Sequence, residues 1–130
     1  MTLRAAPYWA LLVLIVVCAF VPLAGQADDL VGSYTVSGRN QDGATYTGTA
    51  EIASEGEVYG VRWLVEPNAQ MIGIGLREGD VLSVIFQMAD GSVGLTAFRI
   101  VQDRNGLTLK GRWTVPGHNV VLPETLTKAR

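Results

Sequence analysis

Apolar and polar residues alternate along most of the chain after residue 30, most clearly between Gly32 and Ile52. Tyr34 and Val36 alternate with small polar residues, and the alternation resumes after a turn and continues to Ile52. A period of two places successive side chains on opposite faces of a β-strand. The residues between the two halves, Asn40 to Gly43, are typical of tight turns. The pattern therefore predicts a β-hairpin with one buried and one exposed face.

Turn signals recur at short, even intervals along the rest of the chain. Seven dipeptides carry them: Asp42-Gly43, Glu55-Gly56, Pro67-Asn68, Glu78-Gly79, Asp90-Gly91, Asn105-Gly106 and Pro116-Gly117. They separate eight predicted strands, near residues 31–38, 45–54, 57–66, 69–77, 80–88, 92–102, 106–115 and 120–127. No interval has the length or the helical periodicity that a crossover connection needs, so we expect neighbouring strands to be antiparallel.

Eight antiparallel strands in sequential order are expected to close into a small up-and-down barrel, because closure removes the exposed strand edges. Glycines inside the predicted strands favour closure, since they allow tight bending and leave room for larger neighbours; they are Gly48, Gly60, Gly73, Gly75, Gly94 and Gly111. The fold class predicted is thus an all-β meander closed into a barrel, with a two-sheet β-sandwich as the alternative.

The N-terminal segment has the pattern of a secretory signal peptide. Arg4 precedes an apolar run over residues 8–21, and small residues lie before a cleavage point after Ala27. We therefore expect residues 1–27 to be a signal peptide, residues 28–130 to form one β-barrel domain, and the protein to be periplasmic or secreted. The alternatives are an uncleaved membrane anchor and a lipoprotein signal at Cys18. Cys18 is the only cysteine, so the mature chain would hold no disulfide.

The charge of the chain bears on whether it could bind nucleic acid. The full chain has 10 basic and 12 acidic residues, and loss of Arg4 with the signal peptide leaves 9 basic residues and a net charge near −3. Binding to nucleic acid requires a concentrated basic surface, so no nucleic-acid partner is expected.

A set of short motifs spread over almost the whole mature chain resembles a family of small exported bacterial β proteins, some of which carry a fibronectin-binding label. The motifs are Gly32-x-Tyr34-x-Val36-x-Gly38, Asn40-x-Asp42-Gly43-x-x-Tyr46-x-Gly48, Tyr59-x-Val61-x-Trp63, Gly73-x-Gly75, Gly79-Asp80-x-Leu82-Ser83-Val84, Gly111-x-Trp113 and Glu124-x-Leu126. The Gly-x-Trp elements and the strand number also resemble the calycin barrels, the lipocalins and avidins among them. Tyr34 stands where lipocalins carry the Gly-x-Trp motif of the first strand.

The sequence holds few residues for catalysis or metal binding. His118 is the only histidine, and no nucleophile-elbow motif accompanies it. In the mature chain, one histidine without cysteine does not provide the three or so protein ligands of a zinc site. Two segments, Asn40-x-Asp42-Gly43 and Asp103-x-Asn105-Gly106, resemble the start of a calcium loop, but neither is followed by the final glutamate, so both are interpreted as turns. We expect no catalytic residues, no metal site, no cofactor and no enzymatic activity.

One binding hypothesis places a small apolar or glycan-like ligand at the end of the barrel that carries the longer loops. Connections on alternate turns share an end of an up-and-down barrel, which brings the loops near residues 40, 67, 90 and 117 together. The predicted binding residues are Tyr34, Tyr46, Trp63, Trp113, Arg39, Asn40, Asp42, Asn68, His118 and Asn119.

A second hypothesis concerns the outside of the barrel. The fourth to sixth predicted strands carry apolar residues on both faces, so one apolar face must point outward. The predicted contact surface is formed by Val81, Ile85, Val93 and Leu95. The function expected from the sequence is non-catalytic binding, with contact to a second copy or an unknown protein partner ahead of ligand capture, and a hydrolase as the distant alternative.

Overall fold

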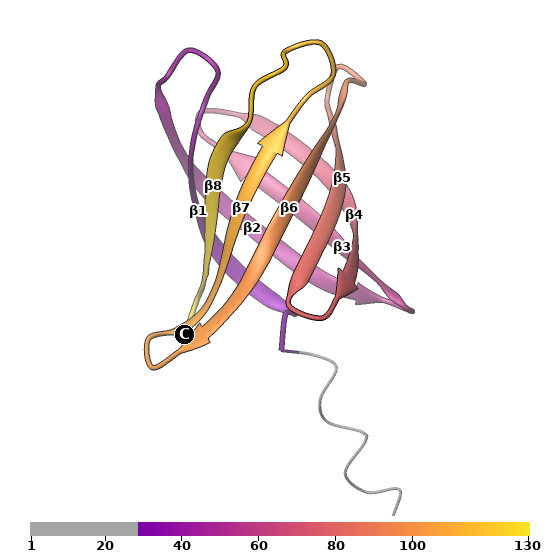
Figure 1. Ribbon diagram of the computed structural model, residues 1–130, viewed down its shortest axis with the longest axis vertical. Helices are drawn as coiled ribbons and strands as arrows, with labels where there is room; N and C mark the ends of the chain where they lie inside the picture. Colours follow the sequence, from indigo (N-terminus) through magenta and orange to yellow (C-terminus); the bar gives the residue numbers. More distant parts are fainter. Residues whose placement is uncertain (1–28) are drawn as a thin grey trace, which may run out of the picture.

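The computed structural model describes residues 29–130, which form one antiparallel β-barrel (Figure 1). Its strands are β1 (Gly32–Arg39), β2 (Thr45–Glu55), β3 (Val58–Val65), β4 (Ala69–Glu78), β5 (Val81–Met88), β6 (Val93–Asp103), β7 (Gly106–Thr114) and β8 (Leu122–Lys128). The segment predicted to be a signal peptide, residues 1–27, and the cysteine in it lie outside the described residues.

Each strand pairs with the next in sequence, and β1 also pairs with β8, so the sheet closes on itself. The closing register runs from Tyr34 opposite Lys128 to Gly38 opposite Glu124. This confirms the predicted eight-stranded barrel over the sandwich alternative. The observed strands begin and end within two residues of the predicted ones.

Asp42 and Asp103 stabilise the turns in which they lie. Asp42 Oδ1 accepts a hydrogen bond of 2.9 Å from the Ala44 amide, and Asp103 Oδ1 accepts one of 2.8 Å from the Asn105 amide. These local bonds fix the backbone two residues ahead, as Asx turns do. The interpretation of both calcium-like segments as turn chemistry is therefore confirmed.

Connections on alternate turns lie at the same end of the barrel (Figure 1). Residues 40–44, 66–68, 89–92 and 115–121 form what we call the loop end. The short turns at residues 56–57, 79–80 and 104–105 lie at the opposite end, together with residues 29–31 and the C-terminus. We call this the N-terminal end.

Large side chains fill the barrel where neighbouring strands have glycine. A Cβ atom on Gly94 would collide with the Phe86 ring, and one on Gly73 would lie 3.1 Å from the ring of Trp63. On β4 the inward positions are Met71, Gly73 and Gly75, whereas the isoleucines between them point outward. Small residues on one strand therefore give interior space to aromatic rings on the next.

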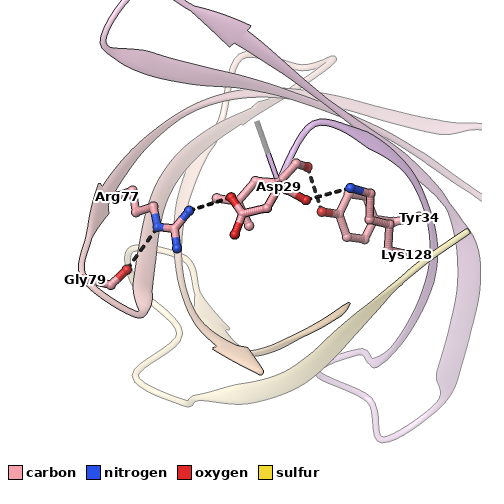
Figure 2. Close-up of polar contacts among 6 residues, drawn as sticks. Asp29, Tyr34, Arg77, Gly79 and Lys128 are labelled. Atoms are coloured by element: carbon pink, nitrogen blue, oxygen red, sulfur yellow. Dashed lines mark hydrogen bonds and ion pairs between the residues drawn. The ribbon is translucent and has the colours of Figure 1, made fainter. Parts of the chain in front are cut away.

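The N-terminal end of the barrel is closed by the residues that precede β1. Leu30 is fully buried there, and its carbonyl oxygen accepts a 2.6 Å hydrogen bond from the Tyr34 hydroxyl. Figure 2 shows Asp29 between Arg77 on one side and Lys128 and Tyr34 on the other. Arg77 Nη1 lies 2.8 Å from Asp29 Oδ1, and Lys128 Nζ donates to the Asp29 carbonyl at 2.6 Å. The interior is thus sealed at this end.

Among the described residues, none belongs to a helix that could cross a membrane.

Leu30→Ala is expected to lower the free energy of unfolding of residues 28–130 by about 2–5 kcal/mol, because it removes a fully buried side chain from the seal. Leu76→Ala is the matched control: Leu76 is 60% exposed on the outer face, and its truncation should cost under about 0.5 kcal/mol. Urea unfolding followed by circular dichroism measures both. Equal stabilities for the two variants would show that Leu30 does not seal the barrel.

Candidate functional site

The half of the barrel nearer the loop end holds a cavity of about 540 Å³. Pockets for small molecules in proteins typically measure roughly 300–1,000 Å³. Strands β2 to β8 and three loops of the loop end contribute to its lining, which consists of Asn40, Tyr46, Trp63, Val65, Asn68, Ala69, Gln70, Met71, Phe86, Met88, Ala89, Asp90, Thr96, Trp113 and Glu124. Most of these side chains are apolar or aromatic, and most of the polar ones lie near the loops.

A buried carboxylate is the main polar feature of the cavity. Glu124 on β8 is only 7% exposed. Its Oε1 accepts a 2.8 Å hydrogen bond from the Tyr46 hydroxyl, and its Oε2 accepts a 3.2 Å bond from the indole Nε1 of Trp63. The two donors come from β2 and β3, so Glu124 ties three strands together through side chains.

Burial shifts the proton affinity of this group. Burial raises the pKa of Glu124 above its ordinary value of 4.5, because the charged form loses hydration, and the hydrogen bonds from Tyr46 and Trp63 oppose the increase. Burial also raises the pKa of the Tyr46 phenol; the charge of Glu124 and the hydrogen bond to it add to this effect, and an interaction with Trp113 opposes it. Tyr46 therefore remains a proton donor to Glu124.

Trp113 contributes a second polar group to the same cavity. Its indole Nε1 is buried and makes no hydrogen bond of standard geometry among the described residues, although an interaction of Trp113 with the Tyr46 hydroxyl lowers the pKa of that group. A buried donor without a well-formed hydrogen bond costs free energy, so such groups are uncommon in folded proteins. Phe86 packs edge to face against both tryptophans, with ring centroids 5.9 Å from Trp63 and 6.3 Å from Trp113. We call Tyr46, Trp63, Phe86 and Trp113, together with Glu124, the aromatic–acid cluster.

The structure brings together half of the residues that the sequence predicted for a ligand site. Five of the ten line the cavity: Asn40, Tyr46, Asn68, Trp63 and Trp113. Asp42 and His118 border a shallower depression between the loops beside it. Arg39 and Asn119 lie in neither hollow, and both are exposed.

Tyr34 does not lie at the end of the barrel with the longer loops, where the sequence analysis placed it among the ligand-binding residues. It is 1% exposed, and its hydroxyl bonds to Leu30 at the N-terminal end. Tyr34 belongs to the seal because it lies near the start of β1, and β1 begins at the N-terminal end.

Sequence reasoning missed Glu124, although a signal was present. Glu124 shares its parity on β8 with Leu122 and Leu126, and alternation places all three on the inner face. A charged residue between two inward leucines is an indication of a buried polar site. Phe86 and Thr96 were also missed, since buried apolar or hydroxyl residues on alternating strands carry no distinctive pattern.

The predicted contact surface is largely exposed. Ile85, Val93 and Leu95 are 52%, 42% and 55% exposed, whereas Val81 is half-buried. The surface is wider than predicted, because β4 adds further outward apolar residues: Ile72, Ile74 and Leu76. Strand pairing sets Ile74 opposite Ile85, and Ile85 opposite Leu95, in one continuous row. Its role in contact with another protein stays a prediction.

Within residues 29–130, no group of three or more His, Cys, Asp or Glu side chains is arranged to hold a metal ion.

The stability of the protein is expected to fall as the pH rises through the titration of Glu124. The folded state has the higher pKa, so it binds more protons than the unfolded state between 4.5 and the raised value, and the free energy of unfolding decreases across that window. Glu124→Gln removes this contribution, whereas Glu51→Gln, on the exposed outer face, retains it. Urea unfolding at a series of pH values measures the difference, and parallel profiles for the wild type and Glu124→Gln would contradict the burial of this carboxylate.

Comparisons with known proteins show a similarity of fold alone. No family model matches the chain, and no curated protein sequence matches it. Among solved structures, a de novo designed fluorescence-activating β-barrel has a TM-score of 0.53 at 15% identity, over 79% of this chain and 96% of that one. EF1p2_mFAP2b, solved bound to DFHBI, also has a TM-score of 0.53, at 12% identity and with the same coverage of both chains. The chain is therefore similar in fold to designed and ligand-bound β-barrels.

Proposed function

We propose that this protein is an exported, non-catalytic binding protein that holds a small, largely apolar molecule inside its barrel. The observation that carries the proposal is the cavity of about 540 Å³ into which the aromatic–acid cluster is built. Apolar walls with a few convergent polar groups are characteristic of small-molecule sites.

The polar groups of the cluster favour an occupant. The buried indole N–H of Trp113 makes no hydrogen bond of standard geometry in the described chain, and a well-placed acceptor atom on a ligand would offset that cost. Glu124 retains unused lone pairs, because each of its oxygens accepts one protein hydrogen bond and can accept two. The cavity thus offers both a donor and free acceptors beside apolar rings.

The similar barrels support the proposal at the level of the fold. One is described as fluorescence-activating, and the other was solved with DFHBI bound. A barrel similar in fold to this one can therefore bind a small molecule.

The proposal also includes export and binding without catalysis. Export is supported by the signal-peptide pattern of residues 1–27. Binding without chemistry is favoured because His118 is exposed in the β7–β8 loop. Asp90 is the other acid in the lining. It accepts hydrogen bonds from the amide and the hydroxyl of Ser92, and these bonds lower the pKa of its carboxyl group.

Native mass spectrometry of residues 28–130, purified from a bacterial periplasm, together with binding of the neutral hydrophobic dye Nile red, tests this function. Wild-type protein is expected to carry an added small-molecule mass or to increase Nile red fluorescence. Ala69→Trp should reduce the increase by about tenfold or more, since Ala69 lines the cavity beside the loop end and a large ring there would obstruct entry.

Ala53→Trp is the matched control, because Ala53 is an exposed position of β2 outside this cavity. Equal dye signals for Ala69→Trp and Ala53→Trp would place the dye outside the barrel. An apo mass combined with no dye response from the wild type would contradict the proposed function.

Self-association through the outer face of β4 to β6 is the second candidate. The row Ile74, Ile85 and Leu95 is uncharged, so two copies could oppose the same strip without bringing like charges together. The sheet has no free edge, so contact would be made through side chains.

Ile85→Lys combined with Leu95→Lys is expected to convert a dimer to a monomer without loss of folding, since both side chains are more than half exposed. Analytical ultracentrifugation measures the mass, and circular dichroism checks the fold. A wild type that stays monomeric at high concentration would rule out self-association, and unfolding of the double variant would show that these residues stabilise the barrel instead.

A further inference from the structure

The cavity has a one-sided charge distribution. Among the described residues that line it, Asp90 and Glu124 are acidic and none is Lys, Arg or His. Arg62, Lys110 and Arg112 are exposed instead, on the outside of the barrel. A pocket lined with one sign of charge and apolar walls concentrates its field and attracts the opposite charge. The interior is thus suited to a positive group.

The rings around the carboxylate favour the same charge. Trp63 and Trp113 both pack against Phe86, and Tyr46 bonds directly to Glu124. Aromatic ring faces are electronegative and attract ammonium groups that lie within about 6 Å of the ring centroid. Several rings beside one carboxylate form the kind of site that binds protonated amines.

No cation pairs with this carboxylate among residues 29–130. Glu124 is buried, and within this part of the chain it accepts hydrogen bonds only from the neutral groups of Tyr46 and Trp63. The basic side chains beside its partners on the two paired strands are exposed: Arg39 on β1, and Lys110 and Arg112 on β7. A buried charge is stabilised by a hydrogen-bonded partner of opposite sign.

We propose, as an extension that rests on the ligand-binding function above, that the cavity selects hydrophobic organic cations. The amine would donate to Glu124, its apolar body would lie against Met71, Met88 and Phe86, and an oxygen on the ligand would accept from Trp113 Nε1. The site thereby gains a charge-assisted hydrogen bond that a neutral or anionic ligand of equal size does not make.

Three probes that share one carbon skeleton separate charge from hydrophobicity: phenylbutylamine, phenylbutanol and phenylbutyrate. Residues 28–130 contain two tryptophans, Trp63 and Trp113, and both line the cavity, so intrinsic tryptophan fluorescence reports its occupancy directly. Titration at neutral pH should show phenylbutylamine binding at least about tenfold more tightly than the alcohol, and phenylbutyrate binding most weakly.

The preference should depend on Glu124. Glu124→Gln is expected to reduce the amine-to-alcohol affinity ratio to about one, whereas Glu51→Gln, a charge change of the same kind on the outer face, should retain it. If Glu124→Gln fails to fold, the order of the three probe affinities in the wild-type protein still tests the inference.

The possible outcomes distinguish this inference from the function on which it rests. Binding of the alcohol as tightly as the amine, blocked by Ala69→Trp, would overturn the cation preference and leave a ligand-binding cavity. No fluorescence response to any of the three probes, with no Nile red response, would overturn both. A preserved amine preference in Glu124→Gln would remove Glu124 from the recognition of the cation.

Discussion

The pairing of β1 with β8 is the constraint on which the rest of the structure depends. It sets Tyr34 opposite Lys128 at one end and Gly38 opposite Glu124 toward the other end, and this pairing closes the meander into a barrel. Closure gives every strand one inner and one outer face. It also brings Glu124, near the end of the chain, to the hydrogen-bond donors on β2 and β3. Without this pairing the acid would lie on an open edge strand.

The barrel is filled unevenly, and this unevenness creates the site. At the N-terminal end, Leu30 and Tyr34 close the interior, and Asp29 is held by Arg77 and Lys128. At the loop end, aromatic rings lie over inward glycines, as Phe86 does at Gly94, and space remains among them. The result is a cavity closed at one end that contains one deeply buried carboxylate. A small molecule would enter between the loops.

The sequence predicted the fold closely because its signals are local. Acid-Gly and Asn-Gly turns fix the chain reversals, and Asp42 and Asp103 act in the turns as expected. The site was predicted less completely because it depends on contacts between distant strands. Alternation identifies the inner face of β8, but only closure shows that Glu124 meets Tyr46 and Trp63. On β4, alternation alone does not reveal that glycines rather than isoleucines face inward, since that choice depends on the bulk of Trp63 and Leu82.

The most direct test of this structure is the pKa of Glu124, measured by carbon-detected NMR of its side-chain carboxyl group in residues 28–130 without ligand. A carboxyl buried in the barrel should titrate above its ordinary value of 4.5, because desolvation outweighs the hydrogen bonds from Tyr46 and Trp63. Titration at or below that value would contradict a buried acid in the cavity, and with it the basis for cation recognition.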